Sequence, residues 1–172
     1  MDLASTIRSV PDFPIEGILF YDITTMLKNP AALKESIDQL TQHYQNKKID
    51  VVAGIESRGF IFGMPLAYQL GVGFIPIRKP GKLPAETVAE SYDLEYGSNT
   101  LEIHVDAVEK GQKVLVVDDL LATGGTAAAT CNLIEKLGGE VAGLAFIIEL
   151  SFLQGRDKIK NYDIFSLLTY DE

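Results

Sequence analysis

Two adjacent acids and a glycine-rich turn are the residues of this 172-residue chain most able to do chemistry. Asp118 and Asp119 follow a run of four apolar residues, 114–117, of the kind that a strand buried on both faces requires. We therefore expect the strand to end at these acids. The turn at 122–126 reads ATGGT, and an apolar face with the period of a helix follows it. The sequence predicts a strand, an acidic pair, a glycine turn and a helix in that order.

This order of elements suits a phosphorylated ligand. Ligands of open parallel sheets bind beyond the carboxyl ends of the strands. A helix start offers unpaired backbone N–H groups and the positive end of a dipole there, and glycines let the chain curl round a phosphate. The acids cannot bind the phosphate because like charges repel, so their natural partners are hydroxyl groups or a metal ion shared with the ligand. A sugar phosphate fits both halves, whereas a tight turn with a solvated acid pair would explain only the glycines.

Cations that could hold an anionic ligand follow two other predicted strands. Arg58 comes after the strand predicted at 51–55, where a bidentate contact to phosphate and a plain surface ion pair fit the residues equally well. Arg78, Lys79 and Lys82 lie on a loop that prolines keep irregular, and a solubilising loop is the alternative interpretation. Because the net charge is −9, an anionic substrate has to be held by such local cations.

The elements that must position these residues alternate between strands and helices. This alternation predicts an α/β fold with a mainly parallel, twisted sheet and flanking helices. A helix capped by Asn29 is expected before the strand at 51–55, and further strands are expected at 140–148 and 163–168. Residues 87–96 and 100–105 predict a hairpin that could fold over a crevice.

Length and composition limit the class of protein. The chain is long enough for a single domain that buries a core without disulfides, and its one cysteine, Cys131, excludes an internal disulfide. We expect Cys131 to be a small buried side chain. With no signal-peptide-like start and no apolar run near ~18 residues, we expect a cytoplasmic protein that does not bind a membrane. The negative charge argues against a nucleic-acid partner.

The stretch VVDDLLATGGT resembles the motif with which type I phosphoribosyltransferases bind 5-phosphoribosyl 1-diphosphate (PRPP). The segments GILFYDIT, ESRGF, IRKPGKLP, ESYDLEYG and LEIHVDAV are similar, in the same order, to those of the members that act on adenine. The resemblance covers nearly the whole chain. It implies the type I phosphoribosyltransferase fold in one domain, 1–172, with a base-binding hood at about 1–30 and a flexible hairpin lid at about 83–103.

The resemblance also implies a reaction. Adenine and PRPP give AMP and pyrophosphate in purine salvage, through an oxocarbenium-like transition state, in a homodimer. Mg²⁺ is implied as the cofactor, carried by PRPP oxygens rather than by direct protein ligands. A cis peptide bond between Glu56 and Ser57 is implied as well.

The roles of individual residues are carried over from matching positions. Glu95 is implied as the acid and base of the reaction, and Tyr96 as a residue that closes the lid. The ribose hydroxyls are assigned to Asp118 and Asp119. The remaining assignments are the 5-phosphate to Ala122, Thr123, Gly124, Gly125 and Thr126; the pyrophosphate to Ser57, Arg58, Arg78, Lys79 and Lys82; and adenine to Leu19, Phe20 and Tyr21.

Tyr21 departs from the family pattern, which usually has arginine at this position. The departure leaves open an enzyme of the same fold that acts on another base, such as xanthine or orotate. A regulatory protein that senses PRPP or nucleotides without turning them over is the alternative outside enzymology. The sequence has no DNA-binding helix pair and no basic patch for that role, and it has the lid carboxylate Glu95. We expect adenine to be the preferred base.

Overall fold

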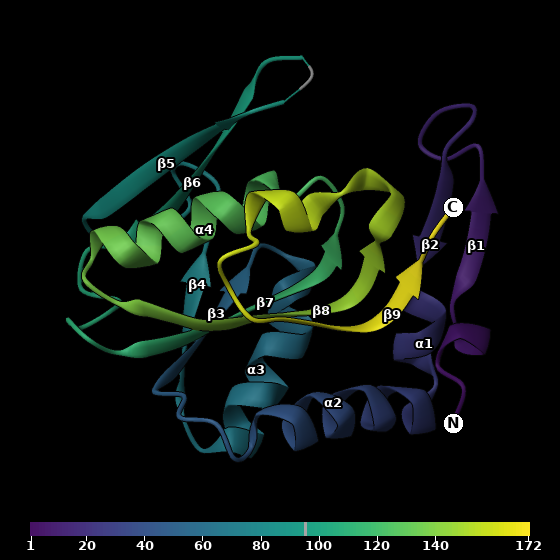
Figure 1. Cartoon of the computed structure of the whole chain (residues 1–172), viewed down its shortest axis with the longest axis horizontal. Coiled ribbons are helices and arrows are strands. Elements are labelled where there is room, and N and C mark those ends of the chain that lie inside the picture. The colour runs from purple at the N-terminus through teal and green to yellow at the C-terminus, as the bar shows by residue number, and fades with distance from the viewer. Residues whose placement is uncertain (95) are drawn as a thin grey trace.

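A five-stranded parallel sheet forms the centre of the computed structural model, which describes residues 1–94 and 96–172 (Figure 1). The strand order is β4-β3-β7-β8-β9, and every neighbouring pair is parallel. The strands are β3 (Val51–Ile55), β4 (Gly73–Ile77), β7 (Lys113–Leu121), β8 (Glu140–Leu150) and β9 (Ile164–Tyr170). The predicted α/β class with a mainly parallel sheet is confirmed.

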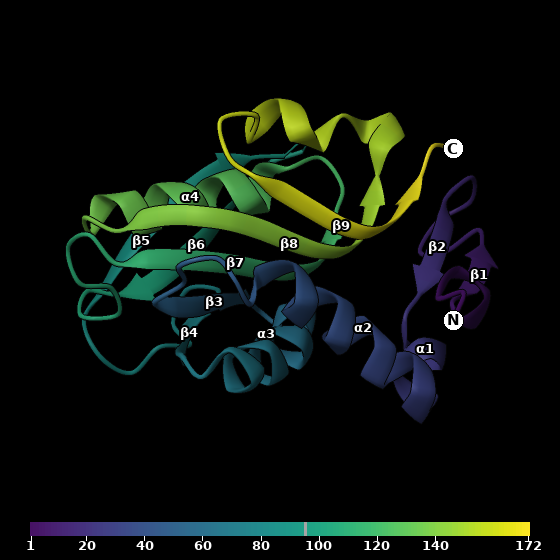
Figure 2. The same ribbon diagram turned by 60° about the horizontal axis from the view of Figure 1, so that its bottom comes forward.

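Helices cover both faces of this sheet, as Figures 1 and 2 show. In β7, Val114 and Val116 pack with the core on one face, and Leu115 and Val117 pack with the core on the other. All four side chains are buried, because successive residues of a strand point to opposite faces and each face is covered. The covering helices are α2 (Pro30–Tyr44) and α3 (Arg58–Leu70) on one face and α4 (Gly125–Lys136) on the other.

The start of α2 follows the capping chemistry that the sequence predicts. Asn29 Oδ1 accepts hydrogen bonds from the backbone N–H groups of Ala31 at 3.0 Å and Ala32 at 3.2 Å. Pro30 occupies the first turn, where its missing N–H group costs nothing. The cap fixes where the helix that underlies the sheet begins.

The strand that carries the acidic pair is longer than expected. The expectation that it ends at Asp118 was wrong, because β7 continues its pairing with β8 as far as Leu121. Its pairing with β3 stops at Val117, where β3 has given way to the turn into α3. Asp118 and Asp119 therefore lie where β7 has a neighbour on one side only.

Two antiparallel hairpins extend from the central sheet. The first, β1 (Arg8–Pro11) with β2 (Leu19–Asp22), follows a short 3₁₀ turn (Ala4–Thr6) and leads into α1 (Thr24–Lys28). It lies beside the C-terminal end of β9 (Figure 1). The rings of Tyr21 and Tyr170 stack there, with centroids 3.9 Å apart.

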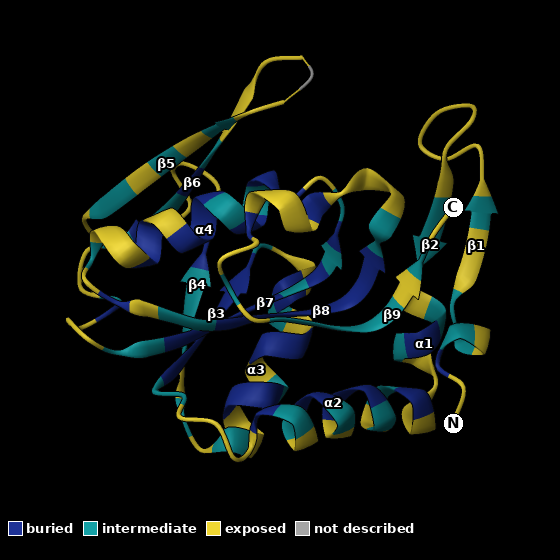
Figure 3. Cartoon of the chain, viewed as in Figure 1, coloured by how far each residue is buried: buried dark blue, intermediate teal, exposed yellow. Residues whose placement is uncertain are grey.

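The second hairpin, β5 (Thr87–Asp93) with β6 (Ser98–His104), confirms the predicted hairpin and lies on the side of α4. Its base is fixed to the core by Leu101 and Ile103, which are buried. Its outer end is exposed, like that of the first hairpin (Figure 3). Two more 3₁₀ turns (Ser151–Leu153 and Gly155–Lys158) connect β8 to β9.

Cys131 lies on α4 and is buried, as expected. Burial raises the pKa of its thiol to about 12, so the side chain behaves as a small apolar group. Across the residues that the structure describes, no helix has the length and apolar character needed to cross a membrane.

Candidate active site

A polar cavity of about 340 Å³ lies beyond the carboxyl ends of β3 and β7. It is the place where an α/β sheet of this kind binds ligands. The residues that line it are Glu56, Ser57, Arg58, Lys79, Asp118, Asp119 and the whole segment 120–127. The structure thus brings together the acids, the glycine turn and two of the cations that the sequence singled out.

The glycine turn is shaped by close contact between two stretches of backbone. Gly124 has a φ of 85°, in the left-handed region that favours glycine, and α4 begins at the next residue. A Cβ atom at Gly124 would clash with the carbonyl oxygen of Gly155, and a Cβ atom at Gly155 would clash with the carbonyl oxygen of Ala122. The turn therefore keeps its shape because glycine occupies both sides of the contact.

An ion pair outside the cavity holds Gly155 in place. Arg156, the next residue, donates from Nε and Nη2 to the two carboxylate oxygens of Glu149, at 2.6 and 2.8 Å. Ser166 donates to the same carboxylate at 2.9 Å. The bonds from Arg156, with that from Ser166, lower the pKa of Glu149 although the residue is buried. The 3₁₀ turn behind the glycine loop is thereby tied to the end of β8 and, through Ser166, to β9.

Arg58 and Asp119 form an ion pair inside the site, with Nε and Oδ2 2.5 Å apart. The arginine side chain is 53% exposed, whereas the aspartate is 12% exposed. The charge of Asp119 raises the pKa of Arg58. The sequence left two interpretations open for Arg58, a contact to phosphate and a surface ion pair. The structure contains an ion pair, but its acid is Asp119 of the site and not a surface acid.

Asp118 is the acid of the site whose pKa the surroundings raise. Burial raises the pKa of its carboxyl group well above the ordinary value, and the neighbouring charge of Asp119 raises it further. A hydrogen bond from the backbone N–H of Asp119, at 2.9 Å, acts in the opposite direction. A carboxylate with a raised pKa in a cavity is a typical feature of functional sites, and Asp118 is half-buried in this one.

Other residues singled out by the sequence lie outside the polar cavity. Arg78 donates from Nε to Glu56 at 2.7 Å, and Lys82 is exposed on its loop; neither belongs to the described lining. Tyr96 is 87% exposed at the outer end of the hairpin. Glu95 lies outside the described residues. The cis peptide bond between Glu56 and Ser57 is present, as the resemblance implied.

A second, mainly apolar cavity of about 410 Å³ adjoins the first and shares Arg58, Asp119 and Leu120 with it. Phe20 and Tyr21 line it, whereas Leu19 is exposed and is not part of the described lining. The remaining lining residues are Val10, Phe13, Asp22, Ile23, Thr24 and Ile148. Its apolar walls and aromatic rings suit a flat heterocycle placed next to a phosphorylated ligand.

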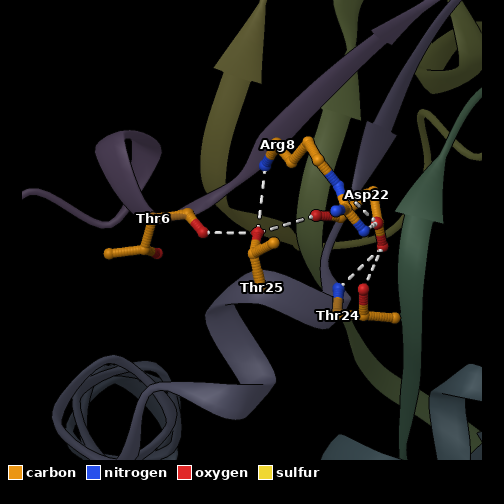
Figure 4. Close-up of polar contacts among 5 residues, drawn as sticks. All are labelled: Thr6, Arg8, Asp22, Thr24 and Thr25. Carbon is orange, nitrogen blue, oxygen red and sulfur yellow. Dashed lines mark hydrogen bonds and ion pairs between the residues drawn. The ribbon is translucent and has the colours of Figure 1, made fainter.

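Asp22 fixes the wall of this apolar cavity through a hydrogen-bond network (Figure 4). Its Oδ1 accepts from the backbone N–H of Thr24 at 2.9 Å and from the Thr24 hydroxyl at 2.6 Å, and Arg8 Nε donates to Oδ2 at 3.0 Å. The bonds from Thr24 and Arg8 lower the pKa of Asp22 to about 2. Thr25 adds a second link, because its hydroxyl donates to the Thr6 carbonyl at 2.7 Å and accepts from Arg8 N–H at 3.1 Å.

Several residues of the site were not identified from the sequence. Gly155 lies in an irregular segment and gives no pattern that would indicate its contact with Gly124. Asp22 forms its network with residues of another strand and of α1. Glu56 could have been found, because it occupies the end of a predicted strand, as the acidic pair was expected to do. The other omissions depend on contacts between segments that are distant in the sequence.

Comparison with known proteins gives consistent matches along the chain. The model of the phosphoribosyl transferase domain family matches residues 22–170. An adenine phosphoribosyltransferase of Koribacter versatilis is 61% identical over 170 residues, covering 99% of this chain and 93% of the relative. One of Chloroflexus aurantiacus is 63% identical over 169 residues, covering 98% of each chain.

Solved structures agree with these sequence matches. The adenine phosphoribosyltransferase of Thermoanaerobacter pseudethanolicus superposes with a TM-score of 0.95 at 54% identity, covering 98% of each chain. That of Saccharomyces cerevisiae, in complex with an imino-altritol bisphosphate and adenine, superposes with a TM-score of 0.91 at 44% identity, covering 97% of each chain.

The raised pKa of Asp118 predicts that this residue lowers stability at neutral pH. Because the folded state binds the proton more tightly than the unfolded state, the ionised carboxylate opposes folding above the raised pKa. Asp118→Asn is expected to raise the melting temperature at pH 7, by about 2 to 4 °C for each kcal/mol regained. The gain should shrink as the pH falls towards 4. Asp106→Asn, at an exposed aspartate, is the control, and a gain that does not depend on pH would contradict the interpretation.

Proposed function

The chain belongs to the phosphoribosyltransferase family, in the branch that converts adenine and PRPP to AMP, and we propose that its two joined cavities hold these substrates side by side. The observation that carries the proposal is the shared wall of the cavities. Arg58, Asp119 and Leu120 line both, so a ligand in the polar cavity would touch one in the apolar cavity. This is the proximity that a transfer between two substrates requires.

PRPP would occupy the polar cavity in an orientation that its charges dictate. The 5-phosphate would lie in the turn of Ala122, Thr123, Gly124, Gly125 and Thr126, at the start of a 12-residue helix that supplies free N–H groups and a positive dipole. The ribose hydroxyls would lie on the acids of β7, which can accept hydrogen bonds from them.

The pyrophosphate group would lie on the opposite side of the ribose, against Ser57, Arg58 and Lys79, which line the same cavity. Arg78 would have to release the carboxylate of Glu56 to join them, and Lys82 would have to leave its exposed position. Their proposed part therefore depends on movement of the loop that carries them.

Binding of PRPP would exchange the partners of the Arg58–Asp119 ion pair. The ribose hydroxyls would take the place of the guanidinium group at Asp119. Arg58 would then be free to donate to the pyrophosphate oxygens, which carry more negative charge than one carboxylate. The exposed arginine can move at little cost, whereas the nearly buried aspartate cannot.

Adenine would occupy the apolar cavity, with Phe20 as the stacking ring. Phe13 packs edge-on against Phe20, with centroids 5.1 Å apart, and so supports that ring from behind. Tyr21 stacks on Tyr170, which explains how this chain accommodates tyrosine where the family usually has arginine. Leu19 would contribute backbone groups only. The complex of the yeast relative with adenine supports a base site in this fold.

The reaction would proceed through charge separation at the anomeric carbon of the ribose. As pyrophosphate leaves, that carbon becomes cation-like, and a nitrogen of adenine attacks it. Arg58, Lys79 and Ser57 would stabilise the negative charge of the departing group. Glu95, which lies outside the described residues, is proposed to exchange the proton that adenine must lose, and Tyr96 to close the lid.

The donor set of the polar cavity fits Mg²⁺ that arrives with PRPP. Among the described residues, 1–94 and 96–172, no group of three His, Cys, Asp or Glu side chains is placed to hold a metal ion. Three carboxylates, those of Glu56, Asp118 and Asp119, do line the cavity. Mg²⁺ is commonly held by one or two carboxylates together with substrate phosphates. When bound, it would neutralise charge on the pyrophosphate.

A homodimer is proposed from an apolar stripe on α3. Ile61, Met64 and Tyr68 are spaced to lie on one face of the helix, and they are 40%, 53% and 83% exposed. Scattered apolar residues are normal on a surface, but a continuous stripe is typical of an interface. Because α3 begins at Arg58, a second subunit on this stripe would lie close to the cavities.

A cytoplasmic location is proposed from the single, buried cysteine.

The role of Glu95 predicts a selective loss of turnover. Glu95→Gln is expected to lower kcat for AMP formation by about 10²- to 10⁴-fold, the usual contribution of an acid–base residue, with the KM for PRPP nearly unchanged. The assay follows nucleotide formation from equimolar adenine, hypoxanthine, guanine and orotate with PRPP and Mg²⁺. Glu86→Gln, at an exposed glutamate, is the control. A variant that keeps the wild-type kcat would remove Glu95 from the mechanism.

The proposed mode of Mg²⁺ binding predicts a thermal shift that needs both ligands. Mg²⁺ alone should leave the melting temperature unchanged, because no complete protein site is expected. PRPP with Mg²⁺, near 100 times the dissociation constant, should raise it by about 5 to 10 °C, and a chelator should reverse most of the rise. An equal rise with Mg²⁺ alone would indicate a metal site formed by the protein itself.

The proposed interface predicts that one charge on α3 separates the subunits. Met64→Glu is expected to raise the dimer dissociation constant by about 100-fold or more, because an unpaired charge at an interface costs several kcal/mol. Molar mass in solution, measured over a range of protein concentrations, gives the constant. Phe152→Glu is the control, since Phe152 is 49% exposed on another segment. A monomeric wild-type protein at every concentration would refute the proposal.

A further inference from the structure

One contact between the second hairpin and the glycine turn has no part in the mechanism above. Tyr92 of β5 places its hydroxyl oxygen 2.8 Å from the hydroxyl oxygen of Thr126, and either group can be the donor. The same ring covers Gly125, where a Cβ atom would come within 2.8 Å of ring carbon Cδ2. A single side chain of the hairpin thus rests on two consecutive residues of the turn.

The strand that carries Tyr92 is fixed along α4 by further polar contacts. Lys136, near the end of the helix, forms an ion pair with Glu90 and donates to the carbonyl oxygen of Ala89 at 3.2 Å. Asn132 donates to Glu90 at 3.4 Å. Tyr92 itself packs against the buried core beneath α4. The position of its hydroxyl group is therefore set by the fold and not by a freely moving surface side chain.

We infer that Tyr92 is a positioning residue for the 5-phosphate and acts through the hydroxyl group of Thr126. A hydroxyl group has one proton to donate and can accept two hydrogen bonds. When Tyr92 donates to Thr126, the proton of Thr126 is free to point into the cavity, which Thr126 lines. The threonine is then oriented as a donor before a phosphate arrives.

The inference rests on the proposed binding of the 5-phosphate at 122–126. It adds which group donates and which accepts in the hydrogen bonds that join Tyr92, Thr126 and the phosphate. A phosphate oxygen accepts a hydrogen bond and cannot donate one when ionised, so the occupied turn requires Thr126 as donor and Tyr92 as donor to Thr126. Phosphate binding at the turn and packing of the second hairpin against α4 therefore stabilise each other, because the coupling between two equilibria is reciprocal. A ligand that lacks the 5-phosphate, such as free pyrophosphate, gains nothing from Tyr92.

Tyr92→Phe tests this inference because it removes the hydroxyl group and keeps the ring over Gly125. We expect the KM for PRPP and the dissociation constant of ribose 5-phosphate to rise about 3- to 10-fold, the range of one lost neutral hydrogen bond. The dissociation constant of pyrophosphate, the KM for adenine and kcat should stay within about twofold by the same argument. A variant that merely loosened the fold would not separate these constants.

Ser91→Ala is the matched control. Ser91 is the preceding residue, its side chain is exposed, and its hydroxyl group lies 2.7 Å from that of Thr100 on β6. Because neighbouring residues of a strand point to opposite sides, this variant removes a hydroxyl pair from the hairpin without touching the turn. All constants should remain at wild-type values in Ser91→Ala, and a loss equal to that of Tyr92→Phe would overturn the inference.

A double-mutant cycle with Thr126→Val separates the inference from the function on which it rests. If Tyr92 acts through Thr126, adding Tyr92→Phe to Thr126→Val should not weaken ribose 5-phosphate binding further. If the losses of ribose 5-phosphate binding are fully additive, Tyr92 does not act through Thr126. If Thr126→Val weakens this binding and Tyr92→Phe does not, Tyr92 has no role in it. If Thr126→Val itself leaves ribose 5-phosphate binding unchanged, the Thr126 hydroxyl group does not bind the phosphate and the inference fails, whereas binding by the N–H groups of the turn would stand. If the wild-type protein does not bind ribose 5-phosphate at all, the assignment of the 5-phosphate to the turn fails.

Discussion

The contact between the backbones of Gly124 and Gly155 is the constraint on which the rest of the site depends. It leaves no room for a side chain on either residue, and it fixes the turn whose residues line the cavity. The contact is itself held by Arg156 and the buried carboxylate of Glu149. The turn proposed to bind the 5-phosphate is therefore held by an ion pair that lies outside the described lining of the cavity, so the proposed binding groups are separate from the interactions that maintain their geometry.

Asp22, Glu149 and Asp118 differ in how far the fold satisfies their carboxylates. Asp22 and Glu149 each receive hydrogen bonds from an arginine and from one hydroxyl group, and their pKa values are lowered. Asp118 lies in the cavity and has a raised pKa. The difference indicates where stability has been given up, and it agrees with the proposal that Asp118 accepts hydrogen bonds from substrate hydroxyls.

The parts of the fold that could be predicted from the sequence are those with local causes. The buried strand at 114–117, the helix cap at Asn29 and the glycine turn each follow from residues within a few positions of one another. The end of β7 could not be predicted, because it depends on which neighbouring strand continues to pair. The same limit applies to the apolar cavity, which combines residues of β1, β2, β7 and β8, and to the contact between Tyr92 and Thr126. The family resemblance supplied roles for residues but not these contacts.

The buried thiol of Cys131 gives the protein an internal reporter of local opening. A thiol reacts with labelling reagents only when it is exposed and deprotonated, and Cys131 in the folded state is neither. The chain has one cysteine, so labelling reports on a single site, the packing of α4 against the core around Cys131. Because the turn proposed to bind the 5-phosphate leads directly into that helix, thiol labelling under native conditions would report on openings that also remove the support of this turn.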